Sequence, residues 1–128
     1  MAIIVYNKET EDYSNSENNY PIYRGSVLGN PYTHLPLAKT KAMFHVGSRD
    51  EAVERYSAYF DLQYGRDESF TEIIDEMYEK YKNGEDIYLE CYCHPLKCHG
   101  DIIAEKLQKR LLKERITEAK EQRNNGKI

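Results

Sequence analysis

The three cysteines of this chain all lie between Cys91 and Cys98, and this clustering restricts how the fold can be stabilised. The disulfides of small secreted domains join cysteines that are spread along the chain. Cysteines this close together cannot link distant segments, so the fold has to depend on a buried apolar core. The odd count and the clustering indicate a reducing compartment and a local site.

The composition provides enough material for one such core. The chain has 128 residues, of which 40% are hydrophobic, and 12 tyrosines add to its Ile, Leu and Val. This length corresponds to a single domain over residues 1–128. The net charge of −4 differs from the basic footprint of proteins that bind duplex nucleic acid, so such binding is not expected. Without an apolar run near ~20 residues or a signal-peptide pattern, we expect a soluble, cytoplasmic protein with no membrane contact.

Strand signals and helix signals alternate along the chain, as in proteins of the α/β class. Short apolar or alternating runs predict strands at Ile3–Tyr6, Pro21–Tyr23 and Asp86–Tyr92. Apolar spacings of three and four predict helices that begin near Arg49 and Ser69, and a last helix begins near Gly100. We therefore expect a small central sheet with helices on its faces.

Capping boxes mark the starts of the first two helices, with Ser48 and Glu51 in one and Ser69 and Glu72 in the other. The charged stretch 113–128 is predicted to be a helical tail that frays beyond Glu118. The polar stretch 7–19 is predicted to be a loop that is flexible or ordered only by its neighbours.

The segment from Leu89 to Asp101 holds most of the residues suited to chemistry. It contains every cysteine and two of the four histidines, and it joins the end of a strand to the start of a helix. In open α/β sheets, ligands bind at this junction because backbone amides and the positive end of the helix dipole face the crevice.

Four interpretations of this segment are open. Zinc could be held by Cys91, Cys93, Cys98 and a histidine, although structural zinc sites usually take ligand pairs from separate segments, so we expect no bound metal. A disulfide between Cys91 and Cys93 would be strained. Cys98 could be a reactive thiol whose pKa is lowered by the helix dipole and by His99. Alternatively, Cys91 and Cys93 are core residues, and residues 98–101 shape a ligand-binding turn through their amides.

A glycine-containing loop offers groups for an anionic ligand. Gly25, Gly29 and Asn30 allow a close approach, and the guanidinium groups of Arg24 and Arg49 suit a phosphate. Tyr32 or Tyr92 could stack on a base. If the strands that precede the two loops run parallel, both loops emerge at one edge of the sheet. We then expect one pocket lined by Arg24, Asn30, Arg49, Cys98, His99 and Asp101.

Three segments resemble, in order, the motifs of the family known as domain of unknown function 4326, which is found in bacteria, phages and some fungi. They are the loop 24–32, the helix signature 49–56 and the cysteine-rich segment 91–101. The resemblance runs from about Ile4 to Leu107, with Tyr23 where the family often has Gly. It implies a small Rossmann-like domain with a largely parallel sheet and a nucleotide-type ligand.

Three functions follow as alternatives. The first is a binding domain for a nucleotide-like anionic ligand, which in a phage could sequester or degrade a host signal nucleotide. Its ligand-binding residues would be Arg24, Gly25, Gly29, Asn30, Arg49, Tyr92, His99 and Gly100. The second is an enzyme acting on a nucleotide or a nucleic-acid end, with Cys98 as the nucleophile and His99 and Asp101 for proton transfer. The third is a zinc-stabilised interaction module. A homo-oligomer is compatible with each.

Overall fold

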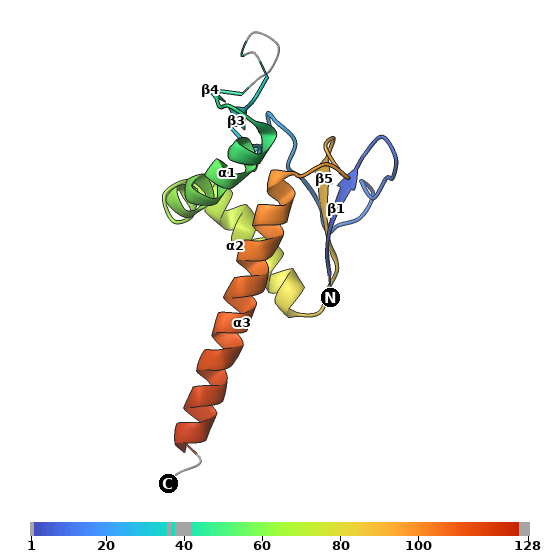
Figure 1. Ribbon diagram of the computed structural model, residues 1–128. Helices are drawn as coiled ribbons and strands as arrows, with labels where there is room; N and C mark the ends of the chain where they lie inside the picture. Colours follow the sequence, from blue (N-terminus) through green and yellow to red (C-terminus); the bar gives the residue numbers. More distant parts are fainter. Residues whose placement is uncertain (1, 36, 38–41, 126–128) are drawn as a thin grey trace.

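The computed structural model describes residues 2–35, 37 and 42–125, which form a mixed α/β structure (Figure 1). In chain order the elements are β1 (Ile3–Asn7), β2 (Asn19–Pro21), β3 (Tyr32–Thr33), β4 (Phe44–His45), α1 (Arg49–Gln63), α2 (Glu68–Lys82), β5 (Ile87–Cys91) and α3 (His99–Asn125). Within these residues, no helix has the length and apolar character that a membrane crossing requires.

The main sheet has β5 in the centre, with β1 on one side and β2 on the other, and both pairings are parallel. This confirms that the strands expected near Ile3–Tyr6 and Asp86–Tyr92 share one sheet. The second strand begins two residues earlier than predicted and ends at Pro21. The short strands β3 and β4 form a separate parallel pair, for which the sequence gives no clear signal.

The three helices lie on one side of this sheet (Figure 1), which corrects the expectation of helices on both faces. On the helix side, Ile87 and Leu89 are fully buried in the apolar core. The opposite face is covered by the loop between β1 and β2. In that loop, the Tyr13 ring stacks on Tyr88 with centroids 4.4 Å apart and meets the edge of Tyr6 at 5.1 Å. These aromatic contacts replace a second layer of helices.

The starts of α1 and α2 follow the capping rules, but only the first was predicted at the right residue. The Ser48 hydroxyl accepts a hydrogen bond from the Glu51 amide at 3.1 Å, as its capping box requires. In α2 the cap is Asp67, whose carboxylate accepts from the Phe70 amide at 3.0 Å. Ser69 therefore lies inside the helix, because the aspartate two residues earlier provides a cap of its own.

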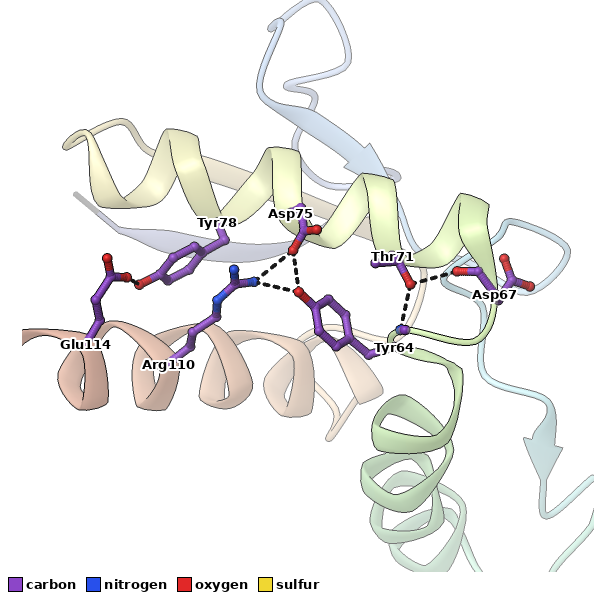
Figure 2. Close-up of polar contacts among 8 residues, drawn as sticks. Tyr64, Asp67, Thr71, Asp75, Tyr78, Arg110 and Glu114 are labelled. Carbon is purple, nitrogen blue, oxygen red and sulfur yellow. Dashed lines mark hydrogen bonds and ion pairs between the residues drawn. The ribbon is translucent and has the colours of Figure 1, made fainter. Parts of the chain in front are cut away.

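Polar contacts attach α3 to α2 and to the end of α1 (Figure 2). The Arg110 guanidinium lies 3.0 Å from the Asp75 carboxylate and 3.9 Å from the centroid of the Tyr78 ring. The Tyr64 hydroxyl donates to the same carboxylate, and the Tyr78 hydroxyl donates to Glu114. Beyond this cluster α3 extends away from the rest of the protein and continues to Asn125, past the point where the sequence predicts fraying (Figure 1).

The start of α3 is packed tightly against the sheet at Gly100. A Cβ atom at this position would lie 2.8 Å from the Ile22 side chain and 3.0 Å from that of Val5. We expect Gly100→Ala to destabilise the protein by about 1–3 kcal/mol, the usual effect of overpacking a core. Urea unfolding of both proteins measures this loss. Gly47→Ala is the control, since its added Cβ would meet only the end of the Glu51 side chain; equal stability of the two variants would contradict the prediction.

Candidate functional site

The loops that follow β2 and β5 meet the first turns of α1 and α3 around a cavity of about 290 Å³. Because β2 and β5 are parallel, both loops leave the sheet at the same edge, where ligands of α/β proteins bind. The described residues that line the cavity are Tyr23, Arg24, Asn30, Thr33, His34, Leu35, Arg49, Ala52, Val53, Cys91, Tyr92, Cys93, Lys97, Cys98 and His99.

Five of the six residues expected to share one pocket are brought together in this cavity: Arg24, Asn30, Arg49, Cys98 and His99. Tyr92 also lines it. Asp101, which was expected with them, is exposed and lies outside the lining.

The three glycines named as ligand contacts are also outside the cavity lining and have structural roles instead. Gly25 has a φ of 100°, which favours glycine. Gly29 packs against the backbone of its own loop, where an added Cβ would lie 2.9 Å from the Tyr23 carbonyl oxygen. Gly100 packs against the sheet. Tyr32 does not line the cavity either.

The loop that carries Arg24 is held in place by its own polar side chains. The Arg24 guanidinium donates to the carbonyls of Asn30 and Tyr32, at 3.1 and 2.9 Å. The Asn30 amide donates in turn to the Ala52 carbonyl in α1, at 3.0 Å. These contacts fix the guanidinium at the cavity wall, and burial lowers the pKa of Arg24 without removing its charge.

The residues from Cys98 to Asp101 form a capping box in which a cysteine takes the usual place of serine. The Gly100 amide lies 3.5 Å from the Cys98 sulfur, and the Cys98 amide lies 3.4 Å from the Asp101 carboxylate. Both contacts satisfy donors at the helix start. Asp101 therefore has a structural role at this helix start.

His99 is buried between the sheet and α1. Its Nε2 lies 2.7 Å from the Ile22 carbonyl oxygen, which can only accept, so the proton is on Nε2. Its Nδ1 faces the Cys98 sulfur at 3.6 Å, and its ring packs on Tyr56. Burial lowers the pKa of His99 to about 4, and the nearby charge of Arg24 acts in the same direction. The ring is thus neutral near pH 7.

The thiol that this environment favours as a thiolate is Cys93 rather than Cys98. A hydrogen bond from Cys98, opposed by burial and assisted by the Arg49 and Arg24 guanidinium groups, lowers the pKa of Cys93 to about 6. The same bonding to its neighbours and its own burial raise the pKa of Cys98. Hydrogen bonding by Cys98 also lowers the pKa of Cys91. Only for Cys93 do the guanidinium groups of Arg49 and Arg24 add to this lowering of the pKa.

A neutral His99 ring removes one of the two causes expected to lower the pKa of Cys98, the imidazolium beside the thiol. Among residues 2–35, 37 and 42–125, no three His, Cys, Asp or Glu side chains have an arrangement that could hold a metal ion.

A second cavity, of about 680 Å³, lies between α1, α2 and α3. It is also basic, with Lys106, Lys109, Arg110 and Lys113 in its lining. Three of these cations pair with carboxylates: Lys106 with Asp61 at 2.9 Å, Lys109 with Glu105 at 2.6 Å and Arg110 with Asp75 at 3.0 Å. In the first cavity, Lys97 lies 4.0 Å from the carboxylate of Asp50, which is outside the lining.

The sequence of the chain was compared with those of known protein families. Residues 5–109 match the family described as Domain of unknown function (DUF4326). The chain belongs to the DUF4326 family. No curated protein and no solved structure shows significant similarity to it. The part that matches DUF4326 contains every lining residue of the first cavity, from Tyr23 to His99, whereas the last part of α3 lies beyond it.

Sequence reasoning missed several residues that line the cavity of this DUF4326 chain, among them Tyr23, Lys97 and Cys93. Cys93 was assigned to the core or to a zinc site, yet it is half-buried and lines the cavity. The sequence does contain two arginines, Arg24 and Arg49, and cations near a cysteine favour its thiolate. Their convergence on Cys93 depends on the fold.

The lowered pKa gives a direct prediction for thiol chemistry. Alkylation of Cys93 by iodoacetamide should increase with pH to half of its maximum near pH 6, because only the thiolate reacts. An unperturbed cysteine reaches that point near about pH 8.5. Peptide mapping after brief labelling between pH 5 and pH 9 identifies the modified residue. Cys93→Ser should lose the labelling at low pH, and a wild-type midpoint near the unperturbed value would refute the assignment.

Proposed function

We propose that this protein binds a small anionic ligand of the nucleotide class in the cavity between β2, β5, α1 and α3. The observation that carries the proposal is the charge of the lining. Arg24, Arg49 and Lys97 contribute three cations, and the described lining residues include no Asp or Glu; the Asp50 carboxylate, 4.0 Å from Lys97, lies outside the lining. This local excess of positive charge contrasts with the net charge of −4 of the whole chain. Guanidinium groups fit phosphate oxygens in pairs, which favours a phosphate-bearing ligand.

The aromatic residues and the volume support the rest of the ligand assignment. The rings of Tyr23 and Tyr92 lie 5.7 Å apart beside the cavity, and Tyr92 is 50% exposed, so its face is available to a planar base. A cavity of about 290 Å³ is at the small end of ligand sites, whose usual range is about 300–1,000 Å³. We therefore propose a ligand of mononucleotide size.

The proposal also interprets the sheet as a reduced Rossmann-like arrangement. In such folds, ligands bind beyond the carboxyl ends of parallel strands, where helix N-termini favour negative charge. Here the ends of β2 and β5 and the first turns of α1 and α3 provide that setting. Turnover is not part of the proposal, because Asp101 is outside the cavity and the His99 ring is held by Ile22.

Thermal unfolding in the presence of nucleoside monophosphates, the matching nucleosides and inorganic phosphate tests this function. We expect at least one monophosphate to raise the Tm by several degrees. The rise should exceed that caused by its nucleoside or by phosphate alone, because only the monophosphate can contact both the arginines and the tyrosine rings. The shift should decrease with added salt. Arg55→Ala is the matched control for Arg49→Ala, since Arg55 is on the same helix, outside the lining. The proposal fails if no compound on the panel raises the Tm, or if Arg49→Ala responds as Arg55→Ala does.

A further inference from the structure

The second cavity, between α1, α2 and α3, combines a buried apolar floor with exposed apolar side chains. Its floor is formed by residues of the three helices, Phe60, Ile74 and Leu107, which are buried. On α3, the side chains of Leu112 and Ile116 line the cavity and are 61% and 47% exposed. Apolar patches of this kind, with polar residues around them, mark contact sites for partners. The second cavity is therefore a candidate docking surface.

From Lys109 to Glu121, the lysines and glutamates of α3 lie on different faces of the helix. Spacings of four, three and four residues place one set of side chains on a single face, here called the lysine face: Lys109, Lys113, Ile116 and Lys120. The carboxylates lie on another face and belong to Glu114, Glu118 and Glu121. Of these, Glu114 pairs with Lys82 of α2. The lysine face begins in the lining of the second cavity and continues along the part of α3 that extends away from the rest of the protein (Figure 1).

The cations of this surface are accessible to the carboxylates of a partner. Among the residues that the structure describes, Lys113 has no ion-pair partner. Lys109 pairs with Glu105 of the same helix, but exposed pairs of this kind contribute little, so another carboxylate can replace Glu105. The described lining of the second cavity has four cations and one carboxylate, that of Asp61, which pairs with Lys106. Charge complementarity therefore favours an acidic occupant.

We propose that the second cavity and the lysine face bind an acidic, amphipathic helical segment of a partner protein. The apolar side of this helix would pack on Leu112 and Ile116, and its carboxylates would pair with the lysines beside them. The stretch of α3 from Lys106 to Lys120 covers about 21 Å, the length of a partner helix of about 14 residues. The proposal goes beyond the nucleotide site and does not depend on it.

Two other occupants match these observations less well. A second copy of this chain, docked through the same face, would bring its lysines against those of the first copy, and like charges across a helix pair repel. An anionic membrane would attract the lysines, but a helix that lies on a membrane needs a broad apolar face of its own. In the described part of α3, the exposed large apolar side chains are Leu112 and Ile116.

The test uses a synthetic peptide of about 18 residues, with leucines at helical spacings of three and four and glutamates at the other positions. One control peptide has lysine in place of each glutamate, and another has serine in place of each leucine. In isothermal titration of the full chain at low salt, we expect the acidic peptide to bind at least about tenfold tighter than either control. Its largest amide shifts in a ¹H–¹⁵N NMR titration should lie around Lys113 and Ile116.

Two variants with the same change of charge locate the binding face. Lys113→Glu should weaken binding of the acidic peptide by about tenfold, because it places a carboxylate opposite the glutamates. Arg115→Glu is the matched control and should change the affinity little, since Arg115 is an exposed cation of the same helix outside the cavity lining. Both positions are exposed, and circular dichroism verifies that each variant is folded.

Several results would overturn the proposal. They are absence of binding of the acidic peptide at about 1 mM, equal binding of the lysine peptide, and equal effects of Lys113→Glu and Arg115→Glu. Sedimentation of the protein as a dimer that Lys113→Glu dissociates would assign the face to a second copy. Binding to phosphatidylglycerol vesicles that Lys113→Glu abolishes would assign it to a membrane. Either assignment would also contradict the acidic helix.

Discussion

Acidification from pH 6.5 to about pH 4.5 should cost this protein about 2–3 kcal/mol of folding free energy through His99 alone. The pKa of the buried ring is about 4, whereas a histidine in the unfolded chain titrates near about 6.5. The unfolded state therefore binds a proton over this interval that the folded state does not bind. The stabilisation is fully present above pH 6.5 and is lost as the pH falls toward 4.

Urea unfolding at several pH values between 7 and 4.5 measures this dependence. In His99→Gln we expect most of the slope over this interval to disappear, since no group at that position titrates. The variant should also be less stable at pH 7, because the hydrogen bond to Ile22 is weakened or lost. His45→Gln is the control, since His45 is exposed. Equal slopes for wild type and His99→Gln would show that another group controls the acid response.

The second large effect is on ligand affinity. Arg24→Ala and Arg49→Ala should each weaken the binding of a phosphate-bearing ligand by about 1.5–3 kcal/mol, or about 10- to 150-fold in Kd, the scale of a charged hydrogen bond. The two variants should differ in stability. Arg24 also binds the carbonyls of Asn30 and Tyr32, so its loss should lower the Tm as well. Arg49 is the first residue of α1, where its charge opposes the helix dipole, so its loss should not weaken the helix.

Isothermal titration with the best monophosphate, together with thermal unfolding without ligand, separates the two effects. The expected pattern is weak binding in both variants and a lowered Tm only in Arg24→Ala. Unchanged affinity in both variants would contradict the assignment of the arginines to the ligand.

The sequence predicted the parts of the fold that depend on local signals. The Ser48 cap follows from residues within one turn, and the parallel pairing of β1 with β5 follows from the alternation of strands and helices. The cap at Asp67 was missed because Ser69 offers the same local signal, and only the helix position distinguishes them. The aromatic cover of the sheet by Tyr13 depends on how a polar loop folds back, which has no periodic signal.

The candidate site shows the same division. Arg24 and Arg49 could be named as candidate phosphate ligands from their residue type, and the structure places both in the cavity lining. The roles of the cysteines and of Asp101 could not be predicted from the sequence, because they depend on contacts over a few ångströms. The sulfur of Cys98 caps a helix, and the Asp101 carboxylate faces an amide rather than the cavity. The low pKa of Cys93 depends first on Cys98 and then on the charges of Arg49 and Arg24, which come from distant segments of the chain.

The most direct test of the proposed ligand site is a ¹H–¹⁵N NMR titration of the wild-type protein with a nucleoside monophosphate. We expect the amides with the largest shifts to belong to the lining of the first cavity, above all Arg24, Asn30, Arg49, Cys93 and His99. Absence of shifts, or shifts centred on Lys106, Lys109 and Lys113 in the second cavity, would contradict it.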